Sequence, residues 1–166
     1  MRFVPKAKRA EWHGQAMEAA GGADLGSLIE LWLETKEIDR LVERLRQAKD
    51  AELEGLSHYT TEPAAKRLAK SHPDVAAKVF RALGMRILIA KKSKYYDAAL
   101  GNFEDAKAGY ERAGLARSWD ALVAEVRDAH RRKVGFMAEF ERLVAGPGPS
   151  DKPSFLDRAK SRWSSR

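Results

Sequence analysis

Residues 80–106 read FRALGMRILIAKKSKYYDAALGNFEDA, and this stretch decides the fold. Leu83 and Ile87 lie four positions apart, so they share one face of a helix. Gly84 stands between them without a side chain, which lets a neighbouring helix approach closely at that point. A second stripe follows, in which two small residues flank one aromatic ring: Ala99, Phe103 and Ala106. The stretch therefore predicts two antiparallel helices packed as a hairpin.

This order of large and small residues is the pattern of a tetratricopeptide repeat, with a hairpin about three residues longer than the consensus. One hairpin cannot bury its apolar stripe alone, so about three or four hairpins have to stack. Stacked repeats form curved scaffolds that hold other molecules and rarely perform chemistry. We expect an all-α fold in which antiparallel hairpins stack as a right-handed superhelix, an α-solenoid.

Helical periodicity extends over most of the chain, and no segment alternates apolar and polar residues convincingly enough to indicate a sheet. The clearest helix starts at Ile38, from which apolar residues follow the i, i+3, i+4, i+7 rule. Gly114 is expected to end one helix, and Gly135 is expected to break another. In chain order, we expect helices at about residues 7–20, 24–33, 38–45, 52–56, 63–70, 73–90, 94–113, 119–133 and 136–144.

The expected helix starts depend on capping residues and prolines. Asp24 or Ser27 caps the second helix, and Ser27 with Glu30 has the spacing of a capping box. Pro63 and Pro73 each fit the first turn of a new helix, where a missing amide hydrogen costs little. The residues from 55 to 60 are therefore expected to form a loop.

Length and composition favour one folded domain between two basic ends. The chain has 166 residues, of which 44% are hydrophobic and 33% are charged. Its net charge of +7 is carried by residues 1–10, at +4, and by residues 147–166, at +3, so the stretch between them is formally neutral. We expect a basic extension over residues 1–6, a helical domain over residues 7–146 and a flexible basic tail over residues 147–166.

The sequence also bears on the compartment. Cysteine is absent, which excludes a disulfide framework and thiolate metal sites. No apolar run approaches the roughly 18 residues that a membrane span needs, and no signal-peptide pattern follows the charged start. We expect a cytoplasmic protein that does not bind membranes.

Four segments carry a resemblance to a known family: SHYTTEPAA at residues 57–65, KKSKYYDAAL at 91–100, YERAGL at 110–115 and RRKVGFM at 131–137. Together they resemble the C-terminal helical region of bacterial SWIM zinc-finger proteins, over most of residues 10–145. The resemblance implies a tetratricopeptide-like region that binds a partner. That family's zinc motif is Cys-x-Cys followed by Cys-x-His, and this chain has no cysteine. Zinc binding, and nucleic-acid contact through the finger, therefore do not transfer.

The sharpest polar cluster lies between the two helices of the hairpin. Lys91, Lys92 and Lys94 stand beside Tyr95 and Tyr96, and Arg86 precedes them on the first helix. Three ammonium groups next to two phenol rings are suited to hold phosphate or an acidic peptide. The alternative is a solvated turn whose lysines offset the dipole at a helix C-terminus. The structural interpretation is the more favoured of the two.

A second basic run ends a later helix, at Arg127, His130, Arg131, Arg132 and Lys133. Asp128 lies four positions before Arg132 and is expected to pair with it. That pair, together with compensation of the helix dipole, favours a structural role over a binding role.

No motif for catalysis or for cofactor binding is present. The four histidines are widely spaced and have no metal-ligand rhythm: His13, His58, His72 and His130. Glu104 and Asp105 are adjacent, so on a helix they point about 100° apart and do not converge on one bond. Phosphate-binding glycine loops are missing as well. We expect no catalytic residue, no cofactor and no bound metal.

The leading hypothesis is a non-enzymatic scaffold that binds a protein or an acidic peptide along the concave face of the helical arc. The residues expected to contribute are Arg86, Lys91, Lys92, Lys94 and Tyr95. The alternative is an accessory nucleic-acid-binding module in which the basic ends grip phosphates without reading sequence. An open end of the arc would also allow homo-oligomers.

Overall fold

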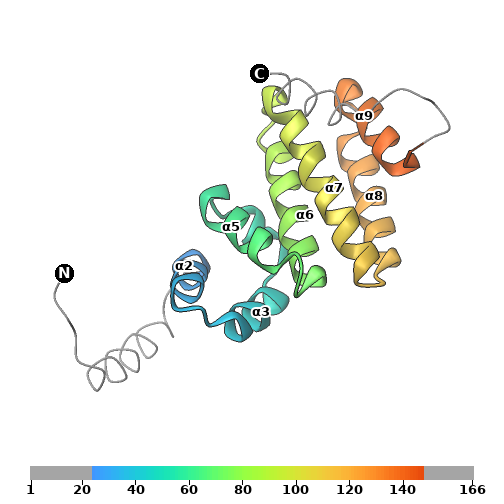
Figure 1. Ribbon diagram of the computed structural model, residues 1–166. Coiled ribbons are helices and arrows are strands. Elements are labelled where there is room, and N and C mark those ends of the chain that lie inside the picture. The colour runs from blue at the N-terminus through green and yellow to red at the C-terminus, as the bar shows by residue number, and fades with distance from the viewer. Residues whose placement is uncertain (1–23, 148–166) are drawn as a thin grey trace, which may run out of the picture.

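The structure, a computed structural model, describes residues 24–147, and all regular structure in that range is helical (Figure 1). The all-α prediction is therefore confirmed for this part of the chain. The predicted helix over residues 7–20 and most of both basic ends lie outside the described residues. In chain order, the elements are α2 (Leu25–Thr35), α3 (Ile38–Gln47), α4 (Asp50–Glu54), α5 (His58–Leu68), α6 (Pro73–Ile89), the 3₁₀ turn η1 (Ser93–Tyr95), α7 (Tyr96–Arg112), α8 (Ala116–His130) and α9 (Val134–Ala145).

Helices α6 and α7 form the predicted antiparallel hairpin at the centre of the molecule (Figure 1). A Cβ atom placed on Gly84 would lie 2.7 Å from Cε1 of Phe103, so the glycine lets the aromatic ring lie directly on the backbone of α6. The stripe on α7 is fully buried, with Ala99, Phe103 and Ala106 each at 0% exposure. The pairing of small and large residues that the sequence predicts is confirmed.

The same two helices approach closely a second time, near the other end of the hairpin. A Cβ atom on Gly109 would lie 2.8 Å from the carbonyl oxygen of Pro73 and 2.9 Å from Cβ of Ala77. Gly84 and Gly109 thus let α6 and α7 stay close along their length, which fixes their relative position. The contact at Gly109 was not predicted.

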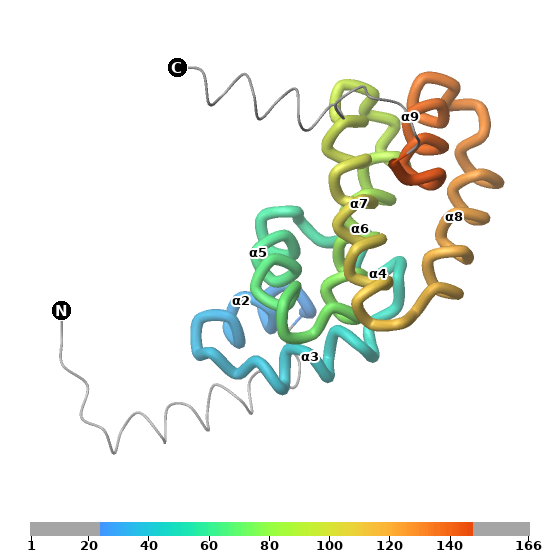
Figure 2. The backbone as a smooth tube through the Cα atoms, turned by 45° about the vertical axis from the view of Figure 1, so that its right-hand side comes forward, coloured from blue at the N-terminus to red at the C-terminus, as the bar shows by residue number. Residues whose placement is uncertain are grey.

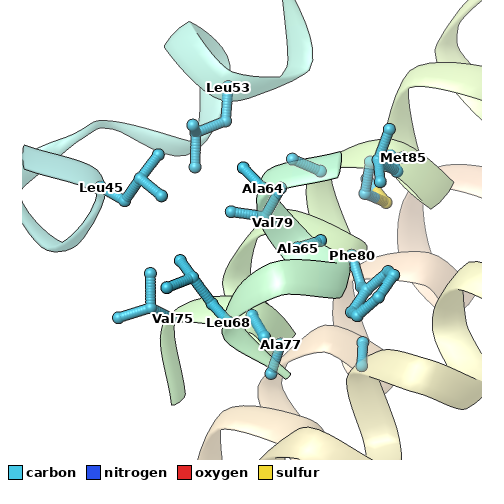
Figure 3. Packing of buried hydrophobic residues seen from close by; sticks show 14 of the residues in the cluster. Leu45, Leu53, Ala64, Ala65, Leu68, Val75, Ala77, Val79, Phe80 and Met85 are labelled. Carbon is cyan, nitrogen blue, oxygen red and sulfur yellow. The ribbon is translucent and has the colours of Figure 1, made fainter. Parts of the chain in front are cut away.

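An N-terminal layer packs against α6. Helix α5 lies on α6, helix α2 contacts α3 and α5, and α3 and α4 contact α6 (Figures 1 and 2). Leu45 of α3 and Leu53 of α4 are buried, and they point towards Ala64 of α5 and Val79 of α6 (Figure 3). This core joins the layer to the central hairpin.

A C-terminal layer covers the other side of α7, which contacts both α8 and α9. Its core is aromatic: the ring of Phe140 lies 5.5 Å from that of Phe103, 5.6 Å from that of Phe136 and 6.4 Å from that of Trp119, measured between centroids. The rings therefore connect α7, α8 and α9 through one shared cluster. Phe136 and Phe140 lie on α9, as the apolar spacing predicts.

The predicted helix ends are confirmed at two positions and wrong at another. Pro73 is the first residue of α6, and Gly114 follows α7 with a φ of +70°, a left-handed conformation that favours glycine. Pro63 does not begin a helix, because α5 already starts at His58. Ser57 caps α5 by accepting a hydrogen bond from the backbone N–H of Tyr59, so the helix begins before the proline.

The N-cap of α2 is Asp24, one of the two predicted caps, and the alternative capping box of Ser27 and Glu30 does not form. The carboxylate of Asp24 accepts hydrogen bonds from the backbone N–H of Ser27 at 3.2 Å and from its hydroxyl at 2.7 Å. Both hydrogen bonds lower the pKa of Asp24, and the bond from the hydroxyl of Ser27 has the larger effect. Glu30 instead accepts a hydrogen bond from the hydroxyl of Thr60 at 2.9 Å, which joins α2 to α5.

The predicted break at Gly135 is also misplaced, because this glycine lies within the first turn of α9. The chain turns earlier, between His130 and Val134, where the backbone N–H of Lys133 donates to the carbonyl of His130 at 2.9 Å. In the part of the chain that the structure describes, no helix is long and apolar enough to cross a membrane.

Candidate functional site

Two turns of the chain lie at the same end of the C-terminal helices (Figures 1 and 2). Helix α6 runs towards this end, α7 runs away from it and α8 returns to it. The turn from α6 into α7 therefore lies near the turn from α8 into α9. These are the turns that carry the two basic clusters found in the sequence.

The two turns enclose a hollow of about 670 Å³. It is lined from α6 and the turn after it by Leu88, Ile89 and Lys91, and from the end of α8 and the next turn by Asp128, Ala129, His130, Arg131, Arg132 and Lys133. We call this site the basic hollow. Its two sides are separated by about forty positions of sequence, so the folded hairpin is what brings them together.

Of the first cluster, Lys91 lines the basic hollow, with a backbone φ of +55° at the end of α6. Lys92 is exposed in the same turn, outside the lining. The ammonium group of Lys94 lies 4.9 Å from the ring centroid of Tyr95, a cation–π contact, and Tyr95 is 45% exposed. Arg86 is half-buried in the last turn of α6 and does not line the hollow.

Of the second cluster, Arg131 and Arg132 line the basic hollow and are exposed. Lys133 also lines it, and its ammonium group lies 5.8 Å from the ring centroid of Tyr96. Arg127 points elsewhere: its guanidinium donates to both carboxylate oxygens of Glu141, at 2.8 and 2.7 Å. Arg127 therefore joins α8 to α9 and is not part of the site.

Among the described residues, the cations of the basic hollow form no ion pair, although the carboxylate of Asp128 also lines the hollow. Lys91, Arg131 and Arg132 have no carboxylate partner among residues 24–147. The predicted pair between Asp128 and Arg132 does not form in this part of the chain, although both residues line the hollow. An anion that enters the hollow would meet several cations already close together, without having to break an ion pair.

A second hollow, of about 380 Å³, differs from the basic hollow in that its charges are paired within the chain. It lies over α6, between α3 and α4 on one side and α8 on the other. Its central charge is Arg81, which is 8% exposed and pairs with Asp50 at 3.3 Å, with Glu54 at 3.1 Å and with Glu125 at 2.5 Å. Three carboxylates from two helices thus surround one buried guanidinium.

The other charges of this second hollow are also satisfied. Arg46 pairs with Asp74 at 3.0 Å, and the ammonium group of Lys78 donates to the carbonyl oxygens of Arg46 and Ala48 at 2.9 and 2.5 Å. Burial lowers the pKa of Lys78. Because each of these charges has a partner within the chain, this hollow serves to hold helices together.

His130, a member of the second basic run, also lines the basic hollow. Its Nε2 atom is buried and has no hydrogen-bond partner among the described groups. Burial, and then the nearby charge of Lys133, lower the pKa of this histidine. The imidazole is therefore neutral at neutral pH.

The chemistry available at the basic hollow is the attraction of anions. Among residues 24–147, no group of three or more His, Asp and Glu side chains is placed to hold a metal ion. The sequence identified each basic cluster, but it did not predict that the two clusters lie around one hollow. The similar lengths of α7 and α8, at 17 and 15 residues, were the signal, since equal antiparallel helices return the chain to its starting end.

The comparisons with known proteins identify the family of the chain but not its function. The model of a family of unknown function, DUF6880, matches residues 7–139. No curated protein and no solved structure matches the chain.

Proposed function

The chain belongs to the DUF6880 family, whose function is unknown, and from its own surface we propose that it is a non-enzymatic scaffold that binds an acidic protein or peptide segment at the basic hollow. The single observation that carries the proposal is the meeting of Lys91 with Arg131 and Arg132 around one hollow, without carboxylate partners among the described residues. Like charges held close together repel one another, so an acidic partner relieves that repulsion.

The proposal changes the place of binding from the expected concave face to the end of the helical hairpins. The hollow that faces α6 between α4 and α8 has its charges paired internally, with Arg81 at their centre. A partner there would have to replace existing ion pairs, whereas a partner at the basic hollow would not. Lys92, Lys94 and Tyr95 lie in the same turn as Lys91 and extend the surface that a longer segment would meet.

We further propose that the helices form a short tetratricopeptide-like arc. The supporting observation is that each helix from α5 to α8 packs on the next helix along the chain, while α7 also contacts α9, the next helix but one. Binding of a partner is also what the resemblance to the helical region of SWIM zinc-finger proteins implies, and the lack of cysteine and of an apolar run favours a cytoplasmic setting. Neither the arc nor the compartment is needed for binding at the hollow.

The test removes the three unpaired cations together. In fluorescence anisotropy with a short labelled peptide of Glu, Asp and Gly, the substitutions Lys91→Ala, Arg131→Ala and Arg132→Ala combined should weaken binding at least about tenfold, or about 1.4 kcal/mol. The side chains are exposed, so the melting temperature should stay close to that of the parent protein.

The matched control removes three exposed cations elsewhere: Arg67→Ala, Lys70→Ala and Arg117→Ala. It changes the net charge equally and should leave peptide affinity within about twofold. Equal weakening by both triple variants would show a general effect of charge and would contradict the proposed site. Tighter binding of labelled DNA or RNA than of peptide, falling steeply between about 50 and 200 mM salt, would favour the nucleic-acid alternative.

A further inference from the structure

The floor of the basic hollow is apolar, although its rim is charged. Leu88 is fully buried at the base, and Ile89 lines the hollow with 54% of its surface exposed. Ile89 is the last residue of α6, directly before the turn that carries Lys91. A branched aliphatic side chain therefore faces solvent beside the unpaired cations.

Further exposed apolar side chains lie in or next to the two turns that enclose the hollow. Val134 directly follows Lys133 and is 76% exposed, and Tyr95 is 45% exposed in the turn after Lys91. Single exposed apolar residues are normal on a protein surface. Here three of the five large exposed apolar residues among the described residues lie in these two turns or at the helix ends next to them. Such a concentration is typical of a surface that a partner covers.

Size also distinguishes this hollow from a simple anion site. A volume of about 670 Å³ falls in the range of pockets that hold organic ligands, and it exceeds what one carboxylate needs. The aliphatic stems of Lys91, Arg131 and Arg132 add apolar surface around the rim while their charged ends stay in water. The site therefore offers contact to an apolar group surrounded by charge.

We infer that the basic hollow takes an acidic peptide segment with one large apolar side chain, which packs on Ile89 while flanking carboxylates meet Lys91, Arg131 and Arg132. The inference rests on the proposed function and names the partner's chemistry. Carboxylates alone would give binding that salt abolishes, because exposed charges are screened. The apolar anchor adds a part of the affinity that salt does not remove, because burial of apolar surface does not depend on charge.

The test compares two labelled peptides of equal charge. Both consist of Glu, Asp and Gly, and one carries a central Phe where the other carries Ser. The parent protein should bind the Phe peptide about tenfold or more tightly than the Ser peptide, as burial of one large side chain implies. At about 200 mM salt the Ser peptide should lose most of its affinity, whereas the Phe peptide should keep the larger part.

Three single variants locate the effect. Ile89→Ser should reduce the difference between the peptides to about twofold, and Ile89→Leu should restore it, because both parent and Leu side chains offer apolar surface of similar size. Tyr59→Ser removes the most exposed large apolar residue in the described structure, away from the hollow on α5, and should leave the difference unchanged. Melting temperatures show that each variant is folded.

The outcomes separate the inference from the proposed function. Equal affinity for both peptides, with loss in the triple cation variant, would overturn the apolar anchor and leave acidic-peptide binding intact. Failure of both peptides to bind at low salt would overturn both. Nucleic acid bound more tightly than the Phe peptide would also overturn the inference, since a phosphodiester backbone offers no such anchor.

Discussion

Gly84 shows how one missing side chain sets the distance between two helices. The ring of Phe103 occupies the place that a Cβ atom would need, at 2.7 Å, and this ring is fully buried in the aromatic cluster. Gly84→Ala should therefore destabilise the protein by about 2 kcal/mol through overpacking, even though alanine is the better helix former. Urea unfolding followed by circular dichroism measures the change.

Gly101 is the matched control for that substitution, since it lies on α7 and has nothing within 4 Å of the added Cβ atom. Gly101→Ala should stabilise the protein by about 0.5 kcal/mol through helix propensity. A Gly84→Ala protein as stable as Gly101→Ala would mean that α6 and α7 separate without cost, which contradicts the close approach.

His130 is expected to make the stability of the protein depend on pH. Burial and Lys133 lower its pKa in the folded state, while Glu125 opposes the shift. The unfolded chain therefore binds the proton more readily, so stability should fall as pH drops below about 6.5 towards the folded-state pKa. His130→Gln should show a smaller loss of stability between about pH 7 and pH 5.5, by urea unfolding at each pH. An identical loss in both proteins would place the responsible titration elsewhere.

At the scale of elements, Arg81 connects α4 and α8 across the surface of α6. Its guanidinium is buried and pairs with carboxylates of both helices. Arg81→Ala should cost about 2 kcal/mol, because the packed stem is lost and the partly buried Glu54 is left without its cation. Arg81→Met should cost less, since it keeps the stem.

Arg46 serves as the control for Arg81, since it also forms an ion pair, with Asp74, but on the surface. Arg46→Ala should cost only about 0.5 kcal/mol. Thermal unfolding of Arg81→Ala, Arg81→Met and Arg46→Ala measures which variant loses the most stability. Equal losses for Arg81→Ala and Arg46→Ala would mean that the buried network does not hold the two helices together.

Sequence patterns predicted the helices and their packing where several local signals agreed. They missed the contacts that form between segments far apart in the chain. The hairpin of α6 and α7 was predicted because Gly84 and Phe103 report directly on packing. Pro63 was expected to begin a helix, but α5 already begins after the cap at Ser57. Gly135 was expected to break a helix, but the chain turns before it, between His130 and Val134. Neither Gly109 nor the partners of Arg81 could be predicted, since these contacts join segments far apart in the chain.

At the scale of the whole molecule, the candidate site exists only in the folded hairpins. Each basic cluster was visible in the sequence, and each alone was best explained by a helix dipole. Their functional meaning comes from the return of α8 to the end where α6 stops, which brings Lys91 to Arg131 and Arg132. The apolar lining was also missed, because Ile89 faces solvent at the end of α6, a helix whose other apolar residues are mostly buried.

The turn at Gly114 has a practical consequence. It joins α7 to α8 at the end of these helices opposite to the basic hollow, and no atom lies within 4 Å of where a Cβ would stand on that glycine (Figure 1). A dye or a biotin tether attached in this turn would face away from the hollow. The protein could then be immobilised in one known orientation, with its binding end presented to the solution.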